Sequence, residues 1–209
     1  MNLGYQIPTF FQWLLPLVVW RKRDCNADGQ KVVYLTFDDG PIPEVTPQVL
    51  DILKQEGVPA TFFMVGDNAR RYPELVDRVR HEGHKIGNHT FHHLKGWGRG
   101  TAAYLEDVDK CDLILGGTRL FRPPYGRVRF TQIFGLKRRG YTLYLWDVLT
   151  HDYSSLMSTE AMVRVVKEFT REGSIIVFHD SIKSGERMLN ALPEVIHWLK
   201  DEGYTLHSL

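Results

Sequence analysis

The sequence has only two cysteines among its 209 residues, Cys25 and Cys111. Their spacing is not that of a zinc site, and two cysteines are too few for a fold that depends on disulfides. The sequence also has no excess of one charge, since 26 basic residues stand against 25 acidic ones. Without a net positive field, or a basic run interleaved with aromatic residues, nucleic acid is not expected as a partner.

The sequence lacks an apolar run long enough to cross a bilayer as a helix. The apolar segment at residues 10–20 contains Pro16 and is followed, rather than preceded, by the basic residues 21–23. No small-residue cleavage site follows it, so we expect residues 1–30 to remain in the mature protein. This N-terminal segment either packs on the outside of the domain or lies on a membrane surface, with an unusual export signal as a third alternative. The compartment, whether cytoplasm, cell membrane or envelope, stays open.

Strand-like and helix-like segments alternate along residues 31–209, with glycine or proline between them. Short apolar runs predict seven strands, at residues 32–37, 60–65, 85–87, 119–121, 141–146, 174–178 and 204–206. Helical periodicity predicts helices at about residues 46–56, 73–82, 104–115, 130–139, 159–172 and 188–202. Such regular alternation predicts an α/β fold with about seven parallel strands, closed as a barrel rather than open. The length fits a single domain.

Two adjacent carboxylates, Asp38 and Asp39, directly follow the first of these strands. The apolar residues of that strand favour burial on both faces, and Gly40 and Pro41 end it. Parallel α/β proteins carry their chemistry at the carboxyl ends of the strands. Two neighbouring carboxylates repel each other unless a cation neutralises one of them, although Asp-Asp-Gly alone also fits an ordinary turn.

Further polar residues follow four other predicted strands. They are His89 and His93, Arg122, Asp147 and Asp152, and His179 with Asp180. Because the carboxyl ends of parallel strands converge on one face of a barrel, we expect all these side chains to share one cleft.

The histidines His89 and His93 are four residues apart, a spacing that places both imidazoles on one side of a helical turn. Together with Asp39 they provide two nitrogens and one carboxylate for a divalent cation, leaving a position for water. By itself the pair also fits ordinary surface histidines. At helical spacing His92 points elsewhere, and the histidines of residues 81–84 lack the spacing of a His-Glu-x-x-His site.

Hydrolysis at such a cation requires a base, an acid and an oxyanion donor. Asp38 is placed to accept a proton from water, and Arg122 is expected to hold it through a bidentate pair. His179 is suited to protonate a leaving amine, with Asp152 keeping the imidazole cationic. The rigid segment at residues 122–126 could present the backbone N–H of Tyr125 to an oxyanion. Taken singly, Arg122 equally fits a salt bridge at the barrel rim, and His179 a helix cap.

Five motifs, in this order and spacing, resemble those of the polysaccharide deacetylases, a carbohydrate esterase family. They are Thr36-Phe-Asp-Asp-Gly40, His89-Thr-Phe-His-His93, Arg122-Pro-Pro-Tyr-Gly126, Asp147-Val-Leu-Thr-His-Asp152 and Ile175-Ile-Val-Phe-His179. The resemblance covers roughly residues 31–209 and implies a deformed (β/α) barrel. It also implies one divalent metal, usually zinc with cobalt or nickel as substitutes, and hydrolysis of N-acetyl groups on N-acetylglucosamine polymers.

The resemblance assigns a role to each candidate residue. It implies Asp38 as base, Arg122 as its partner, Tyr125 as oxyanion donor, His179 as acid tuned by Asp152, and Asp39, His89 and His93 as metal ligands. The leading hypothesis is an N-deacetylase acting on an acetylated glycan of the peptidoglycan or chitin type. The alternatives are an O-acetyl esterase on xylan-type glycans, a small-molecule deacetylase and a glycan-binding module without turnover. We expect a monomer.

Overall fold

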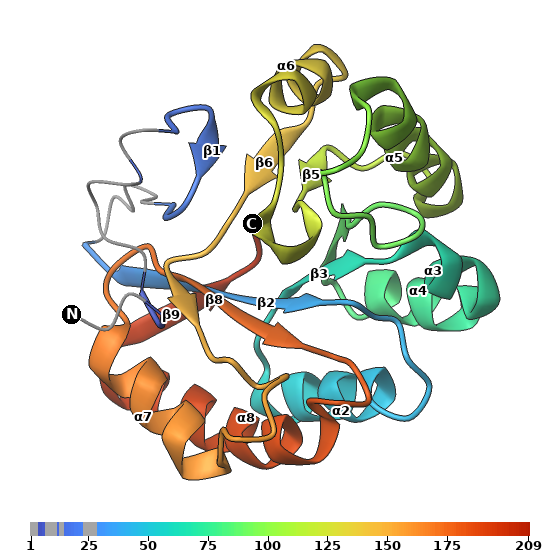
Figure 1. The fold of residues 1–209 in the computed structure, drawn as a ribbon. Coiled ribbons are helices and arrows are strands. Elements are labelled where there is room, and N and C mark those ends of the chain that lie inside the picture. The colour runs from blue at the N-terminus through green and yellow to red at the C-terminus, as the bar shows by residue number, and fades with distance from the viewer. Residues whose placement is uncertain (1–3, 7–11, 13–14, 23–28) are drawn as a thin grey trace.

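A computed structural model describes residues 4–6, 12, 15–22 and 29–209 of the chain (Figure 1). Nine short strands form one curved sheet, and helices surround it. Every ladder between these strands is parallel. This architecture is the deformed (β/α) barrel expected from the sequence. Within the described ranges, no helix has the length and apolar character needed to cross a membrane.

All seven expected strands are present, together with two short ones that the sequence did not predict, β1 and β7. The strands are β1 (Val18–Val19), β2 (Lys31–Asp38), β3 (Thr61–Met64), β4 (Lys85–Asn88), β5 (Leu120–Phe121), β6 (Thr142–Tyr144), β7 (Val148–Leu149), β8 (Ile175–His179) and β9 (Tyr204–His207). The helices are α2 (Thr46–Glu56), α3 (Gly66–Arg71), α4 (Pro73–His81), α5 (Thr101–Leu115), α6 (Phe130–Arg138), α7 (Thr159–Phe169) and α8 (Gly185–Asp201), with the 3₁₀ turn η1 (Pro124–Gly126). Of the helices, α3 was not expected.

Strand β2 lies inside the sheet, whose order is β1-β6-β5-β4-β3-β2-β8-β7, while β9 pairs with the amino half of β2. Seven of its eight residues are buried, as the apolar run predicts. The ring of Phe37 stacks on Phe62 of β3 and Phe178 of β8, with centroids 5.0 and 6.0 Å apart. At the carboxyl end, Asp38 stands in register with His179 of β8. The core therefore fixes the strand end that carries the two carboxylates.

The helices begin and end where the sequence places its signals. The Ser158 hydroxyl accepts the backbone N–H of Ala161 and caps α7, and Gly57 ends α2 in the left-handed conformation. Helices α7 and α8 then pack against each other and cover β2 and β8 with their apolar faces (Figure 1). This packing leaves the loops after the strands free to carry polar groups.

The described part of the N-terminal segment joins the sheet. Strand β1 pairs with β6, and the backbone N–H of Lys22 donates to the carbonyl of Gly173, just before β8 (2.9 Å). Residues 10, 11, 13 and 14 of the apolar segment, and Cys25, lie outside the described residues. A membrane-surface role for this segment therefore stays a prediction.

Candidate active site

The adjacent carboxylates at the end of β2 have separate partners. Asp38 continues the strand and is buried, with 3% of its surface exposed. The backbone of Asp39 turns into the left-handed region (φ 80°), and its carbonyl accepts a hydrogen bond from the Asn68 side chain in α3 (2.9 Å). This turn directs the Asp39 side chain toward the histidines of the β4 loop, while Asp38 contacts Arg122.

The guanidinium of Arg122 is fully buried and holds Asp38 through one nitrogen. Its Nη1 lies 2.6 Å from Asp38 Oδ1 and 2.9 Å from the hydroxyl of Thr36, and its Nη2 donates to the carbonyl of Leu145 (3.2 Å). The plane of the guanidinium lies over the ring of Phe63, 4.1 Å from the centroid. The prediction of a bidentate pair with Asp38 is therefore wrong, because Nη2 donates to the carbonyl of Leu145 and not to the carboxylate. A charge-assisted hydrogen bond away from water still fixes the carboxylate.

The three candidate metal ligands come together around one point. His93 Nε2 and His89 Nε2 lie 3.1 and 3.6 Å from Asp39 Oδ1, and the three ligand atoms are all within 4.8 Å of one another. The helical turn expected for this pair is wrong: residues 89–93 form a loop in which Thr90 and His93 have positive φ angles of 63° and 53°. A loop brings the imidazoles together as a helix would, with ring centroids 5.1 Å apart.

Two buried polar residues hold this ligand loop. The Asn88 side chain accepts the backbone N–H of Thr90, and Asp107 of α5 accepts those of Phe91 and His92. Asp107 also contacts His92 Nδ1 at 2.5 Å, which directs that imidazole away from Asp39. Neither Asn88 nor Asp107 was among the site residues predicted from the sequence. The sequence did contain one signal, because Asp107 is a charged residue on the apolar face of the predicted helix, and a buried charge needs a partner.

The chemistry of the ligand set fits a divalent cation. His89 Nδ1 lies 2.8 Å from the carbonyl of Arg122, and since a carbonyl only accepts, Nδ1 carries the proton and Nε2 offers a lone pair. Burial acts to raise the pKa of Asp39, but His89 and His93 outweigh it and lower the pKa below its usual range. A divalent cation would take the place of the protons between these imidazoles and the ionised carboxylate of Asp39.

His179 and Asp152 form the second charged pair of the site. His179 Nδ1 lies 2.7 Å from Asp152 Oδ1, and the backbone N–H of His179 donates to Oδ2 (2.6 Å). Burial acts to lower the pKa of His179, but the charge and hydrogen bond of Asp152 outweigh it and raise the pKa to about 9. Asp39 and Asp38 add to this upward shift. His179 is therefore a cationic proton donor at neutral pH.

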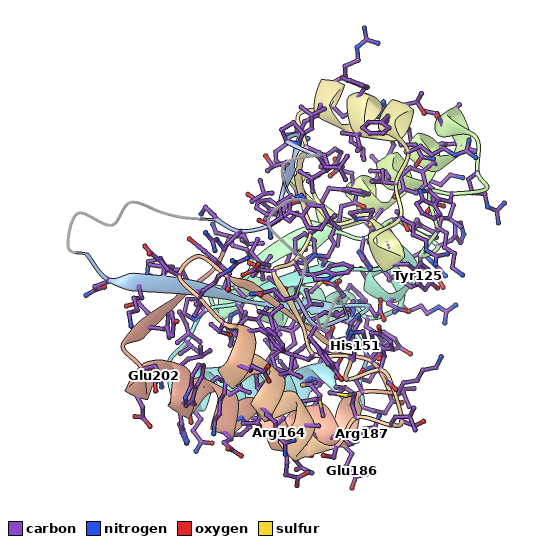
Figure 2. All side chains as sticks on the ribbon, turned by 60° about the vertical axis from the view of Figure 1, so that its left-hand side comes forward. Tyr125, His151, Arg164, Glu186, Arg187 and Glu202 are labelled. Atoms are coloured by element: carbon purple, nitrogen blue, oxygen red, sulfur yellow. The ribbon has the colours of Figure 1, made fainter. Side chains whose placement is uncertain are left out.

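Tyr125, labelled in Figure 2, lies in the turn η1. Its φ is 60°, and the N–H groups of Gly126 and Arg127 close the turn on the carbonyls of Pro123 and Pro124. The Tyr125 ring centroid is 4.6 Å from that of His93. The turn thus places the Tyr125 backbone at the edge of the metal site.

Comparison with known proteins agrees with this geometry. The family profile described as polysaccharide deacetylase matches residues 26–144. The chain belongs to the polysaccharide deacetylase family. It is 35% identical to a peptidoglycan-N-acetylglucosamine deacetylase of Bacillus cereus, over 85% of each chain. It is 31% identical to a chitooligosaccharide deacetylase of Bradyrhizobium sp., over 93% of this chain and 96% of the relative.

Solved structures lead to the same family. A crystal structure of a peptidoglycan N-acetylglucosamine deacetylase, in complex with an N-hydroxybenzamide compound, superposes with a TM-score of 0.88. The two chains are 32% identical, and the match covers 95% of this chain and 94% of the other. The two chains therefore share this fold over nearly their whole matched length.

In this polysaccharide deacetylase, Asp147 lies at the end of the sheet opposite to the active site. Asp147 accepts hydrogen bonds from Arg171 (2.7 and 2.9 Å) and from the hydroxyl of Ser174 (2.7 Å), next to the amino end of β8. The expectation that all the polar sets share one rim is therefore wrong for Asp147, which instead anchors the start of β7 and β8. Asp152, five residues later, does reach the rim.

Asp180 supports the site without belonging to the ligand set. Its carboxylate accepts the backbone N–H of Gly40 (3.0 Å) and the hydroxyl of Thr46 (2.6 Å). Complete burial raises the pKa of Asp180 to about 8. A Cβ atom on Gly40 would overlap this carboxylate, so only glycine fits here. The loop that carries Asp39 is thereby attached to the residue after His179.

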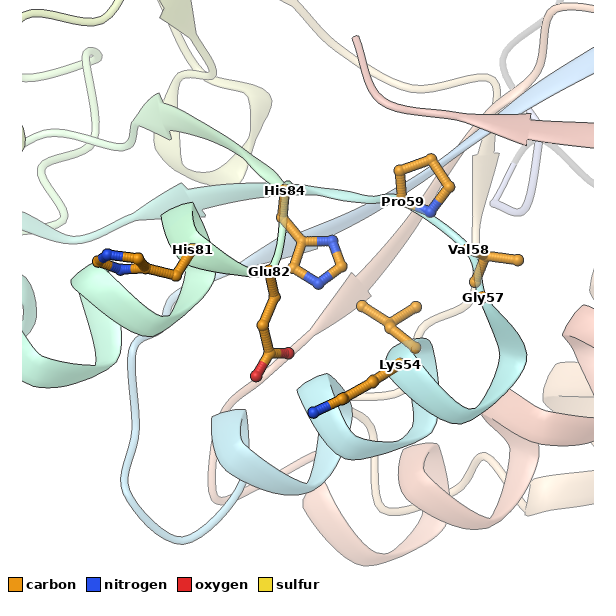
Figure 3. A pocket seen from close by; sticks show the side chains of 8 residues that line it. Lys54, Gly57, Val58, Pro59, His81, Glu82 and His84 are labelled. Atoms are coloured by element: carbon orange, nitrogen blue, oxygen red, sulfur yellow. The ribbon is translucent and has the colours of Figure 1, made fainter.

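The second histidine cluster of the sequence lies away from the site. His84 stands at the amino end of β4, whereas His89 follows its carboxyl end. Figure 3 shows His81, Glu82 and His84 beside a pocket of about 510 Å³. His84 Nδ1 accepts the backbone N–H of Ala60 (3.2 Å), and burial lowers the pKa of the imidazole. His81 and His84 therefore lie apart from the cluster of Asp39, His89 and His93.

Proposed function

We propose that this protein is a metal-dependent hydrolase that removes N-acetyl groups from glycans containing N-acetylglucosamine, of the peptidoglycan or chitin type. The observation that carries the proposal is the pairing of a buried base, Asp38, with a cationic acid, His179, around a three-residue ligand set. The names of the two sequence relatives support the substrate class, since one acts on peptidoglycan and the other on chitooligosaccharides.

Asp39, His89 and His93 would hold the metal. Zinc is the first choice for two imidazoles and one carboxylate, with cobalt or nickel as alternatives. A cation bound there supplies a Lewis acid that polarises the acetyl carbonyl and makes a nearby water more acidic.

The residues of the chain perform the proton transfers. Asp38 accepts a proton from the attacking water, whose oxygen adds to the acetyl carbon, and Arg122 keeps the carboxylate ionised and oriented. The backbone N–H of Tyr125 donates to the oxygen of the tetrahedral intermediate. His179 then protonates the sugar nitrogen as the carbon–nitrogen bond breaks, and acetate and a free amine leave.

Two alternatives are weaker on this geometry. A glycan-binding module needs neither a proton acceptor nor a matched proton donor, so binding alone gives no reason for the pairs Asp38–Arg122 and Asp152–His179 at one site. An O-acetyl esterase would release an alcohol, which needs less help from an acid than an amine does, whereas Asp152 raises the pKa of His179 to about 9.

Acetate release tests the proposal. Chitin oligomers, peptidoglycan and acetylxylan are each incubated with the protein loaded with zinc, cobalt or nickel, and with chelator-treated protein as the control. We expect acetate from the first two substrates in a metal-dependent reaction. Acetate from acetylxylan alone would support the esterase, and binding without any acetate would support the glycan-binding module.

A further inference from the structure

Two stretches of this nearly neutral chain, which include the loops that follow β4 and β5, contain basic residues and no acidic ones. Residues 83–105 contain three Lys or Arg and no Asp or Glu. Residues 113–146 contain seven Lys or Arg and again no Asp or Glu. The chain as a whole has a formal net charge of +1. Of these residues, Lys95, Arg99, Arg127 and Arg129 lie in the loops that follow β4 and β5, on the side of the sheet that carries the active site.

Hydrogen bonds connect the loop between β4 and α5 with the loop between β5 and α6, so that the two form one continuous surface. The backbone N–H of Gly96 donates to the carbonyl of Arg127 (3.0 Å), and Gln132 donates to the carbonyl of Gly96 (2.9 Å). The indole N–H of Trp97 donates to the carbonyl of Val128 (3.3 Å). A Cβ on Gly96 would approach Gln132 Oε1 to 2.5 Å and Arg127 O to 2.6 Å. The loops pack too closely here for any residue larger than glycine.

Alternating aromatic and cationic side chains extend from the metal site along this surface. The Tyr125 ring contacts His93, and Lys95 Nζ lies 4.6 Å from the Tyr125 centroid. The guanidinium of Arg127 lies 5.3 Å from the Trp97 centroid. Both aromatic residues remain open to solvent, with 54% of Tyr125 and 59% of Trp97 exposed. We call Lys95, Trp97, Tyr125 and Arg127 the basic platform.

The cations of the basic platform have no acidic partner within the described part of the chain. Other arginines of the same segments do: Arg122 pairs with Asp38, and Arg139 pairs with Asp109. Lys95 and Arg127 instead lie over aromatic rings, and both residues are exposed to solvent. An exposed aromatic ring provides a face for a sugar, and an unpaired cation beside it provides a partner for an anion.

We propose that the basic platform binds a carboxylate-bearing sugar next to the N-acetylglucosamine unit that is deacetylated. The ring of this sugar stacks on Trp97, and its carboxylate pairs with Lys95 and Arg127. This inference rests on the proposed function and selects, among N-acetylated glycans, those that carry carboxylates, whether on a lactyl ether or as a uronic acid.

The test compares substrates that differ only in charge. A tetrasaccharide in which N-acetylglucosamine alternates with its 3-O-lactyl derivative is prepared as the free acid and as the carboxamide. A second pair carries uronic acid or its amide in place of the lactyl sugar. We expect kcat/KM to be about tenfold higher for an acid than for its amide, mainly through KM, and the advantage to shrink with added salt. The pair with the larger ratio identifies the source of the carboxylate.

Variants assign the preference to the platform. Arg127→Gln and Lys95→Gln should each lower the acid-to-amide ratio about threefold, and the double variant should bring it close to one. Turnover of neutral chitin tetramer and the metal content should stay unchanged. Arg164→Gln is the matched control, because Arg164 is exposed on α7, below the sheet from Tyr125 (Figure 2). Trp97→Ala should raise KM for acid and amide alike.

Several results would overturn the inference. Equal kcat/KM for acid and amide in the wild type, or a ratio that survives in the double variant, would exclude carboxylate recognition by Lys95 and Arg127. Platform-dependent binding to anionic lipid vesicles without any acid preference would assign the patch to a membrane surface. Calorimetric titration with the deacetylated acid and amide gives the same comparison without turnover. Failure of the proposed function is seen separately, as absence of acetate from every substrate, charged or neutral.

Discussion

Both oxygens of Asp152 are bound to one residue, His179: Oδ1 lies 2.7 Å from its Nδ1, and Oδ2 accepts its backbone N–H. The carboxylate therefore fixes the orientation of the ring and favours its charged form. Burial alone would lower the pKa of His179, yet Asp152 raises it to about 9. Nδ1 is thereby occupied by Asp152, which leaves Nε2 as the ring nitrogen that can donate a proton to a substrate.

Activity should fall at alkaline pH as His179 loses its proton, because the leaving amine then lacks an acid. A bound divalent cation repels the imidazolium, so the limb in the metal-loaded enzyme should lie below pH 9. Asp152→Asn removes the negative charge and should move the alkaline limb toward lower pH, while metal content stays the same. Rate profiles of both proteins between pH 5 and about 10 measure the shift. Identical alkaline limbs would exclude tuning by Asp152.

The same pKa predicts how the stability of the metal-free protein changes with pH. The folded pKa of His179, about 9, lies above its ordinary value of 6.5, so the charged imidazole stabilises the fold. This contribution is fully present below about pH 6.5 and is lost as the pH rises through about 9. The Tm of wild type should therefore fall over this window more than that of His179→Gln. Parallel Tm curves for the two proteins would contradict the linkage.

Much of this site was predictable from sequence, because strand ends are fixed by burial patterns. The apolar run of β2 predicts where Asp38 and Asp39 emerge, and the parallel order predicts that His179 returns beside them. The predictions that were wrong concern local backbone geometry. Four-residue spacing suggested a helix for His89 and His93, but two left-handed residues produce the same proximity in a loop.

Two further predictions, on Arg122 and on Asp147, were wrong because they also depend on local backbone positions. The sequence does not show that the carbonyl of Leu145 accepts a hydrogen bond from Nη2 of Arg122. For this reason the prediction of a bidentate pair between Arg122 and Asp38 was wrong. The sequence also does not show where a short strand starts. β7 begins at Val148, which leaves Asp147 at the amino ends of the strands and Asp152 at the rim.

Removing one histidine should release the metal. His93→Ala takes away one of two imidazoles, and we expect metal affinity to fall about 10- to 100-fold or more, measured by competition with a chelator. His92→Ala is the matched control, because its imidazole pairs with Asp107 on the other side of the loop. Unchanged metal content in His93→Ala would remove this residue from the ligand set.

The contact between Gly40 and Asp180 should be sensitive to a single methyl group. Gly40→Ala places a Cβ within the carboxylate of Asp180, so we expect a loss of about 1–3 kcal/mol in the free energy of unfolding and a drop in activity. Gly100→Ala is the control, because a Cβ there meets no atom within 4 Å. Denaturant unfolding of both variants measures the difference. Equal stability would show that the Gly40 loop can shift.

The charge state of Asp180 is tested by a second pair of variants. Burial raises its pKa to about 8, so the group is largely protonated at neutral pH and its negative charge is not required. Asp180→Asn should therefore retain most of the stability at pH 7, whereas Asp180→Ala leaves the Thr46 hydroxyl and the Gly40 N–H without an acceptor. Thermal unfolding compares the two. Similar losses in both variants would indicate that the charged form is needed.

Asp38 and Asp39 are neighbours in the chain, yet their partners predict separable roles. Asp38→Asn keeps the shape and removes the basic oxygen, so kcat should fall about 10²- to 10⁴-fold while the metal stays bound. Asp39→Asn removes the anionic ligand and should lower metal affinity first, with activity partly restored by excess metal. Metal titrations and rates on both variants decide between the roles. Loss of metal from Asp38→Asn with retention in Asp39→Asn would reverse the assignment, and unchanged turnover in both would place the chemistry elsewhere.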